Sequence, residues 1–240
     1  IETAEQIEKA YHTINRSPGP YALVVRKGCF EKEGRRPAVD IPGDAITRRD
    51  AIRAFVEQAP PATAFVATTG LAGRELFDLR KERGESHARD FLNVGAMGHA
   101  SMIALGVALS RPERRVVCLD GDGAFLMHMG AATIVAGESP PNYTHVLLNN
   151  GTHDSVGGQP NQASRIDLAE VASACGYRRI FRAARNDEMA AVAAAAVSAA
   201  GPVFVAIRLA GGTRSEPGRP PDSIVKTARE FHGFLNTGPE

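Results

Sequence analysis

The sequence predicts a doubly wound α/β fold built on a parallel sheet, and three observations support this class. Four short apolar runs, at residues 64–69, 114–120, 144–150 and 202–209, have the composition of strands. Segments of helical character separate consecutive runs. Each connection is far longer than a hairpin turn, so we expect parallel strands with crossover helices on the faces of the sheet.

The remaining elements follow in order along the chain. A helix over residues 1–14 precedes a Ser-Pro-Gly-Pro break and a β-branched run at 21–28 that predicts a strand. Thr47, with Asp50 three residues on, predicts the start of a helix that continues to residue 59. A charged helix is expected to end near Arg83. Further helices are predicted over 97–110, 124–137, 167–175 and 187–200, with a strand-like run at 178–183.

Polar residues rich in Gly, Pro and charge divide the chain after the first predicted strand. We therefore expect three parts: residues 1–30 as the end of a preceding unit, residues 31–46 as a linker, and residues 47–240 as the main domain. The sequence begins with Ile1 inside a predicted helix, so a fragment or a processed chain is expected.

Composition narrows the class of function. With 240 residues, 43% hydrophobic residues and a net charge of +1, the chain is expected to be a soluble, cytoplasmic, globular protein. No apolar run approaches the roughly 20 residues of a membrane-spanning helix, and the absence of a clustered Lys/Arg stripe disfavours nucleic acid as a partner. The three cysteines, Cys29, Cys118 and Cys175, lack metal-ligand spacing and are expected to pack as apolar residues. A small-molecule ligand is the expectation that remains.

Two aspartates in the stretch VVCLDGDGAFLMHMG give the first indication of a site. Asp120 and Asp122 follow an apolar strand, at the end of the sheet where doubly wound folds bind ligands. An EF-hand calcium loop is disfavoured, because its fifth and sixth positions would be Ala124 and Phe125. The Asp-x-Asp-Gly pattern also resembles haloacid dehalogenase-type phosphotransferases, with Asp120 as nucleophile, but that family's following Thr or Val and its Ser/Thr at the next strand end are missing here.

A third interpretation depends on two asparagines at the next strand end. Twenty-five residues separate Gly123 from Asn149, enough for one helix and one returning strand, so Asp122 and Asn150 can face one ion. Carboxylate, amide and carbonyl oxygens suit magnesium, whose remaining positions are left to phosphate oxygens and water. The sequence therefore favours a metal-bound diphosphate over calcium or a phosphoryl group.

GDGAF followed by LLNN resembles the signature of thiamine diphosphate-dependent enzymes. The resemblance implies that the Asp122 and Asn150 side chains and the Thr152 carbonyl bind Mg²⁺, while Gly121, Gly123 and Ala124 meet the diphosphate at a helix start. The loop FLNVGAMGHA resembles the family's pyrimidine-binding loop, with Met97 as the apolar wedge and Gly95 supplying a carbonyl. Residues 66–70, VATTG, resemble the loop that contacts the diphosphate, with Thr68, Thr69 and Gly70 at hand.

Several longer motifs, among them TTGxxxRELFxLR, DFxxVGxMGHASxIALG and LNNGxHDSVGGQP, sharpen the resemblance to the phosphonopyruvate decarboxylase family, with the sulfopyruvate decarboxylases next. It implies decarboxylation of a 2-oxo acid, 3-phosphonopyruvate, to phosphonoacetaldehyde and CO₂ in phosphonate and antibiotic biosynthesis. Candidate substrate and proton-transfer residues are His99, His153, Asp154 and Ser155, and Arg214 and Arg219 could pair with the phosphonate. His128 is expected to be structural.

The family's activating glutamate belongs to a separate pyrimidine-binding domain, and residues 1–30 resemble only its last helix and strand. The resemblance therefore implies that this domain comes from a missing N-terminal segment or a partner chain, in an assembly expected to be a homo-oligomer. The alternatives are another 2-oxo acid such as sulfopyruvate, a ligase that adds the carbanion to a second carbonyl compound, a catalytically inactive assembly subunit, and the phosphotransferase above.

Overall fold

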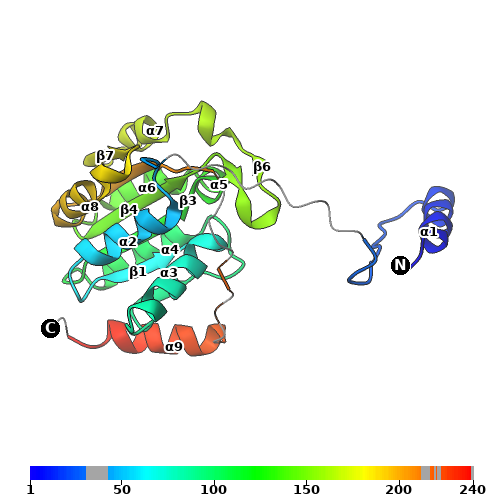
Figure 1. The fold of residues 1–240 in the computed structure, drawn as a ribbon, viewed down its shortest axis with the longest axis horizontal. Coiled ribbons are helices and arrows are strands. Elements are labelled where there is room, and N and C mark those ends of the chain that lie inside the picture. The colour runs from blue at the N-terminus through cyan, green and yellow to red at the C-terminus, as the bar shows by residue number, and fades with distance from the viewer. Residues whose placement is uncertain (31–42, 212–216, 219, 221–222, 239–240) are drawn as a thin grey trace. The chain divides into compact units, whose positions relative to one another are not determined.

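The computed structural model describes residues 1–30, 43–211, 217–218, 220 and 223–238. The chain divides into two units, Ile1–Ala38 and Val39–Glu240, and each is considered by itself (Figure 1). Within the described ranges, no helix combines the length and apolarity needed to cross a membrane. The division into a preceding unit, a linker and a main domain remains a prediction, although Ile46, assigned above to the linker, is fully buried and bridges Leu209 in the second unit.

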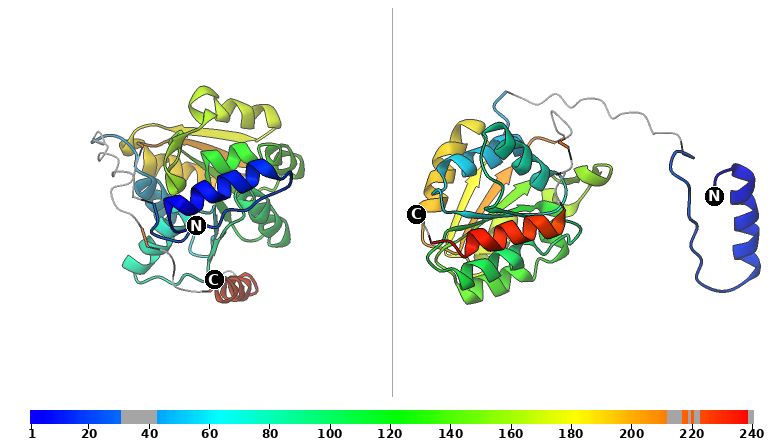
Figure 2. Two further views of the ribbon diagram at one scale, coloured as in Figure 1. Left: turned by 90° about the vertical axis from the view of Figure 1, so that its right-hand side faces the viewer. Right: turned by 90° about the horizontal axis from the view of Figure 1, so that it is seen from below.

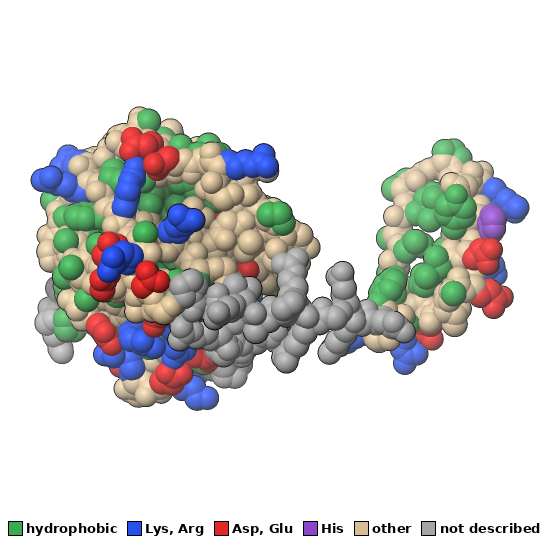
Figure 3. Space-filling view, turned by 45° about the horizontal axis from the view of Figure 1, so that its top comes forward, with side chains coloured by type: hydrophobic (Ala, Val, Ile, Leu, Met, Phe, Trp, Pro, Cys, Tyr) green, Lys and Arg blue, Asp and Glu red, His purple; other side chains and the backbone are tan. Residues whose placement is uncertain are grey.

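The described residues of the first unit, 1–30, hold one helix, α1 (Ala4–Arg16), capped by Thr3 and Gln6. The predicted strand at 21–28 was wrong: residues 21–26 have no regular structure and residues 27–28 form a turn. The segment is joined to the N-terminus by two hydrogen bonds, from Arg26 N to Ile1 O (3.0 Å) and from the Ile1 amino group to Val24 O (2.7 Å). A β-branched run needs a neighbouring strand, and the described part of this unit supplies none. None of the α1 residues is buried, and Figure 3 shows apolar side chains gathered on the unit's surface.

The second unit is built on a six-stranded parallel sheet in the order β2-β1-β3-β4-β8-β7. Its strands are β1 (Ala64–Ala67), β2 (Asp90–Leu92), β3 (Val116–Gly121), β4 (Tyr143–Asn149), β7 (Arg179–Ala183) and β8 (Val203–Arg208). A small antiparallel pair, β5 (Thr152–His153) and β6 (Gln159–Pro160), lies outside this sheet. Because the chain passes from β1 to β2 on one side and returns to β3 on the other, the strand order reverses at β1 and β3. Ligand sites form at such a reversal.

Helices cover both faces of the sheet (Figure 2). One face packs against α2 (Arg48–Gln58), α3 (Leu71–Glu82) and α8 (Met189–Ser198), and the other against α4 (Ala100–Ser110), α6 (Ala131–Glu138), α7 (Leu168–Cys175) and α9 (Ile224–Leu235). Strand residues alternate between the two cores, as Phe65 and Val66 illustrate. The short helix α5 (Asp122–Met127) follows β3, and the 3₁₀ turns are η1 (Asp154–Val156), η2 (Gln162–Arg165) and η3 (Asn186–Glu188).

The doubly wound α/β class is confirmed, and several helix boundaries are refined. Thr47 caps α2 as predicted, accepting a bond from Asp50 N (3.1 Å). The predicted helix over 124–137 is divided into α5 and α6, because the backbone at His128 leaves the helical region. Helix α9 and strand β2 were not predicted. Two of the cysteines are at least partly buried, but Cys29 is exposed, so its predicted packing was wrong.

A buried ion pair fixes the edge strand β2. Arg80 of α3 donates from Nε and Nη2 to the two carboxylate oxygens of Asp90, each at 3.0 Å, and its guanidinium lies 4.9 Å from the Phe65 ring centroid. Both partners are almost fully buried, at 0% and 1% exposure. A two-bond pair of this kind sets orientation as well as distance. It therefore fixes the strand that leads into the loop carrying Met97.

A second buried polar group lies beneath the end of β3. His145 contacts Asp120 Oδ2 through Nε2 (3.3 Å) and Tyr177 through Nδ1 (2.9 Å), and Asp120 Oδ1 accepts a bond from Gly121 N (3.0 Å). Asp120 is 1% exposed and does not line the cavity described below. Asp120 therefore lies inside β3, one residue before its end at Gly121, and its burial away from the cavity disfavours a role as the nucleophile of a phosphotransferase.

Candidate cofactor and metal site

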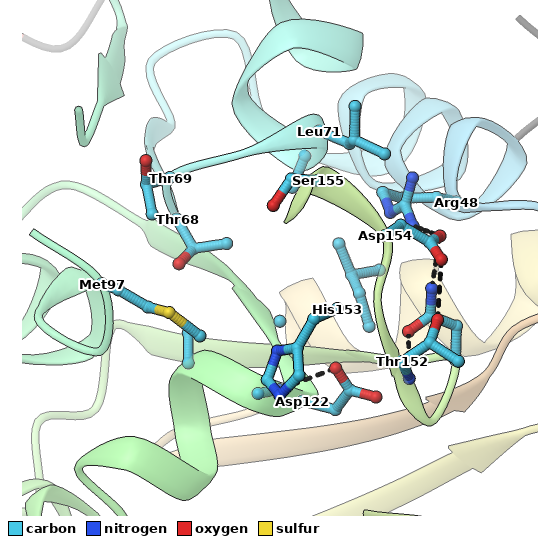
Figure 4. A pocket seen from close by; sticks show the side chains of 16 residues that line it. Arg48, Thr68, Thr69, Leu71, Met97, Asp122, Thr152, His153, Asp154 and Ser155 are labelled. Atoms are coloured by element: carbon cyan, nitrogen blue, oxygen red, sulfur yellow. Dashed lines mark hydrogen bonds and ion pairs between the residues drawn. The ribbon is translucent and has the colours of Figure 1, made fainter. Parts of the chain in front are cut away.

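A small cavity lies at the carboxyl ends of β1, β3 and β4, where the strand order reverses (Figure 4). Its volume is about 80 Å³, which holds only a few water molecules. The cavity is lined by Arg48, Thr68, Thr69, Leu71, Ala72, Met97, Gly121, Asp122, Gly123, Ala124, Leu148, Asn150, Thr152, His153, Asp154 and Ser155. Twelve of these sixteen residues were predicted from the sequence, and nine of the sixteen have polar side chains.

Asp122 begins α5 and is the buried carboxylate of the cavity, at 4% exposure. Its Oδ1 accepts a bond from Gly123 N (2.7 Å) and its Oδ2 accepts one from Gly151 N (2.6 Å), so the β3 and β4 loops meet at this side chain. Burial raises the pKa of Asp122. Among the described residues, no cationic side chain forms an ion pair with it, so a bound cation would supply the missing charge.

The two threonines after β1 provide hydroxyl groups on the opposite wall. Thr68 is 4% exposed, and its Oγ1 has no hydrogen-bond partner among the described residues. Thr69 Oγ1 accepts a bond from Gly95 N (3.2 Å), which joins the β1 loop to the loop that carries Met97. A buried hydroxyl without a partner is costly unless a ligand satisfies it. Thr68 therefore suits an oxygen-rich ligand.

Glycine at position 123 makes room for two side chains. A methyl group there would lie 2.4 Å from His153 Cε1, 2.6 Å from His153 Nδ1 and 3.3 Å from Met97 Cε. In Figure 4 the Met97 and His153 side chains both point toward Asp122. His153 therefore fills the space beside the start of α5, which explains the small cavity.

A buried ionic network supports the loop after β4. The Asp154 carboxylate accepts bonds from Arg48 Nη2 (2.8 Å), Asn150 Nδ2 (2.6 Å) and Thr152 Oγ1 (2.7 Å). Arg48 Nη1 also donates to Glu75 Oε1 (3.1 Å). Three donors thus engage the Asp154 carboxylate and hold the loop that bears Asn150 and Thr152, while the role of Asp154 on the substrate stays a prediction.

The structure brings together most of the predicted cofactor and metal residues but not all of the predicted substrate residues. His153 and Ser155 line the cavity, whereas His99 does not: it is exposed, with Nδ1 3.1 Å from Met97 O and its ring 4.5 Å from that of His128. Gly70 caps α3 and Gly95 lies in the neighbouring loop, both with positive φ and both outside the lining. Arg214 and Arg219 lie outside the described residues.

Arg48 and Glu75 belong to the site but were not identified from the sequence. Arg48 opens α2 and Glu75 lies in the second turn of α3, and both side chains are less than 10% exposed. The available signal was the RELF motif, which contains Glu75. Its ion pair with an arginine 27 residues earlier has no signature in the linear sequence.

The fold and the loop geometry have a counterpart among known families. Residues 72–207 match the model of the thiamine pyrophosphate enzymes' C-terminal TPP-binding domain, so the chain belongs to this family of thiamine pyrophosphate enzymes.

Two groups of curated relatives are similar to the chain. It is 40% identical over 194 residues to a phosphonopyruvate decarboxylase of Streptomyces hygroscopicus, an alignment that covers 80% of this chain and 47% of the relative. It is 39% identical over 153 residues to a sulfopyruvate decarboxylase subunit beta of Methanothermobacter thermautotrophicus, covering 63% of this chain and 76% of the relative. The chain thus spans about half the length of the phosphonopyruvate decarboxylases that it matches.

The fold also has a counterpart among solved structures. A thiamin diphosphate-dependent enzyme isolated from Mycobacterium smegmatis superposes with a TM-score of 0.59 at 22% identity, over 70% of this chain and 32% of that one. At this identity the likeness establishes the fold alone. The class predicted from the sequence and the observed sheet agree with it.

Proposed function

We propose that the complete protein containing this chain is a thiamine diphosphate- and magnesium-dependent decarboxylase of 3-phosphonopyruvate. The observation that carries this is the juxtaposition of Asp122, a buried carboxylate with no described cation partner, and Thr68, a buried hydroxyl with no described partner, at one reversal of strand order. A metal-bound diphosphate would satisfy both groups. The relatives named phosphonopyruvate decarboxylase support the substrate.

The donor set fits magnesium and the diphosphate. Asp122 would supply a carboxylate oxygen, Asn150 an amide oxygen and Thr152 its carbonyl, all of them hard donors that magnesium prefers. The Asn150 Nδ2 group is committed to Asp154, which leaves the amide oxygen as the atom available to a cation. Thr68, Thr69 and the amides at the start of α5 would meet the diphosphate oxygens.

Bound thiamine diphosphate would supply the nucleophilic carbon and the electron sink needed for loss of CO₂. The chain's own residues would bind and orient it: Met97 would pack against the ring system, and Gly95 and Gly70 shape the adjoining loops. His153, at the cavity wall, would hold or transfer a proton near the reacting carbon. Ser155 and His99 are second candidates for contact with the 2-oxo acid, and Arg214 and Arg219 for its phosphonate.

The first unit supports an assembly. Helix α1 buries none of its residues, and Ile7, Tyr11, Leu23 and Val24 are all at least 44% exposed. We infer that residues 1–30 are the last part of a pyrimidine-binding domain and that this surface packs against the rest of that domain, which also brings the activating glutamate. The rest of the domain would come from another segment of a longer chain or from a separate subunit, as the beta-subunit names of the sulfopyruvate decarboxylase relatives suggest. We further propose that the complete protein is a cytoplasmic homo-oligomer that acts in phosphonate biosynthesis.

The test is CO₂ release by the complete protein from 3-phosphonopyruvate, sulfopyruvate and pyruvate, each with and without thiamine diphosphate and Mg²⁺. We expect turnover of phosphonopyruvate that requires both additions and gives phosphonoacetaldehyde. Preference for sulfopyruvate would favour the second candidate, which the 76% coverage of a sulfopyruvate decarboxylase subunit supports. Cofactor binding without turnover of any of the three acids would contradict a decarboxylase and indicate an inactive assembly subunit.

A further inference from the structure

Arg48 is unusual among the arginines of the second unit because it lies at the cavity but faces carboxylates of the protein. Its two terminal nitrogens bond to different partners, Nη1 to Glu75 Oε1 (3.1 Å) and Nη2 to Asp154 Oδ2 (2.8 Å). The side chains of Arg48, Glu75 and Asp154 are 9%, 8% and 13% exposed, so little solvent screens the network. It joins α2, α3 and the loop after β4, which are distant in sequence.

Asp154 is also hydrogen-bonded to two predicted magnesium-binding residues, Asn150 and Thr152. One carboxylate oxygen accepts bonds from both Arg48 and Asn150 Nδ2 (2.6 Å), and the other accepts from Thr152 Oγ1 (2.7 Å). Asn150 Oδ1 in turn accepts a bond from Thr152 N (3.1 Å). The turn from Asn150 to Asp154 is therefore fixed in part by its own side chains. Among the described residues, Arg48 joins it to α2, and Gly151 N joins it to Asp122 at the start of α5 (2.6 Å).

We propose that Arg48, held in place by Glu75, is a positioning residue that sets the geometry of the metal-binding loop through Asp154. The proposal rests on the function proposed above. Arg48 holds the Asp154 carboxylate in place as an acceptor of three hydrogen bonds. Asp154 then fixes which end of the Asn150 amide is a donor, so that its oxygen is presented for the metal, and it holds Thr152 in the same turn.

Charge alone predicts the opposite outcome from positioning, which makes the proposal testable. Arg48 is a cation at the cavity, and its removal would leave the surroundings of Asp122 more negative. If Arg48 acted only through its charge, its loss alone would tighten magnesium binding, and its loss together with the Glu75 charge would leave magnesium binding nearly unchanged. If it acts by fixing the loop, its loss weakens magnesium binding, because displaced supporting residues typically lower metal affinity about 10- to 100-fold.

The experiment measures the Kd of Mg²⁺ by calorimetry at saturating thiamine diphosphate, in the complete protein with any segment or subunit that copurifies. The main variant is Arg48→Met with Glu75→Gln, which removes one charge of each sign and avoids a buried unpaired Glu75. We expect a Kd about 10- to 100-fold higher than that of the wild type. The matched control is Arg49→Met, which breaks the ion pair with Glu82 in the same helix, and it should bind Mg²⁺ like the wild type.

A second comparison isolates the route through Asp154. Adding Asp154→Asn to the double variant should weaken magnesium binding no further than Asp154→Asn alone, because Arg48 acts only through that carboxylate. Tighter or unchanged binding in the double variant, with far-UV circular dichroism unchanged, would overturn the positioning role, and so would fully additive losses. If the wild type itself showed no Mg²⁺-dependent binding of thiamine diphosphate, both the proposed function and the role of Arg48 would be refuted. If the wild type binds and the double variant binds equally well, only the role of Arg48 is refuted.

Discussion

Gly123→Ala tests whether the space beside the start of α5 belongs to the cofactor. The added methyl group would lie 2.4 Å from His153 Cε1, whereas carbon atoms pack at about 3.5–4.0 Å. The histidine ring must therefore move by more than 1 Å, and the Met97 methyl group, at 3.3 Å, must adjust by a few tenths of an ångström. His153 is only half-buried and lies between Gly151 and Gly157, both with positive φ, so the loop can absorb this shift in the free protein.

The expected magnitudes differ between folding and binding. In the free protein, relief of the glycine penalty in a helix, about 1 kcal/mol, offsets the cost of moving His153, so the free energy of unfolding should change by less than about 1 kcal/mol. In the complex the methyl group stands on the wall against which the diphosphate would lie. Overpacking there costs about 1–3 kcal/mol, which corresponds to roughly 5- to 150-fold weaker binding of thiamine diphosphate.

The assay is calorimetric titration of thiamine diphosphate in the presence of Mg²⁺, beside urea unfolding of the cofactor-free protein. Gly137→Ala is the matched control, because Gly137 lies in α6 and an added methyl group there meets no atom within 4 Å. Wild-type affinity in the Gly123→Ala variant would refute the assignment of this space to the cofactor. A large loss of stability in the cofactor-free protein would refute the expected freedom of the His153 loop.

Three further predictions concern buried charges. Asp122→Asn should abolish the rise in Tm that Mg²⁺ and thiamine diphosphate cause. Without ligands the variant should melt no lower than the wild type at pH 7, because burial disfavours the charged form of the Asp122 carboxyl. A retained effect of Mg²⁺ on Tm would contradict the metal assignment. Arg80→Met should lower the free energy of unfolding in urea by about 3–5 kcal/mol, because it leaves the Asp90 charge buried and unpaired, and a loss below 1 kcal/mol would count against that pair. Burial raises the pKa of Glu85, but hydrogen bonds and charge interactions with three arginines have the larger combined effect. They lower the pKa of Glu85 to about 2, below the unfolded value of about 4.3. Its stabilisation, about 2–3 kcal/mol, is therefore present above pH 4.3 and lost as the pH falls toward 2, so Glu85→Gln should flatten the acid side of the stability curve; parallel curves would contradict this.

The site residues that directly follow strands could be predicted, because parallel pairing of the strands places all of these residues at the same edge of the sheet. Thr68, Asp122 and Asn150 each come directly after a strand, and the carboxyl ends of these strands meet at one edge. Gly123, next to Asp122, could also be predicted as a site residue, because other groups must approach the backbone closely where this strand turns into a helix.

The parts that could not be predicted depend on contacts between distant segments. The role of Arg48 is set by Glu75 and Asp154, which are 27 and 106 residues away, and no local pattern marks an arginine that will be buried between two carboxylates. The strand predicted at 21–28 was wrong because local composition is not sufficient for a strand. The composition of this run favours a strand, but a strand forms only where a second strand pairs with it. Helix α9 follows a Pro-rich segment whose composition gave no indication of it.

The pairing of β1 with β3 has a consequence for how the molecule acquires its site. Phe65 lies opposite Val117, and Val117 opposite Thr144, so the three strands that carry the site's loops come together only after long stretches of chain have closed. Closing such stretches is entropically unfavourable and makes the folding of parallel sheets slow. No partly folded chain in which these strands are unpaired can hold Thr68, Asp122 and Asn150 around one ligand. A ligand that binds there would select the fully paired sheet, adding about 2.7 kcal/mol of stability at a free concentration 100 times its Kd, so that occupancy of the site and completion of folding would rise together.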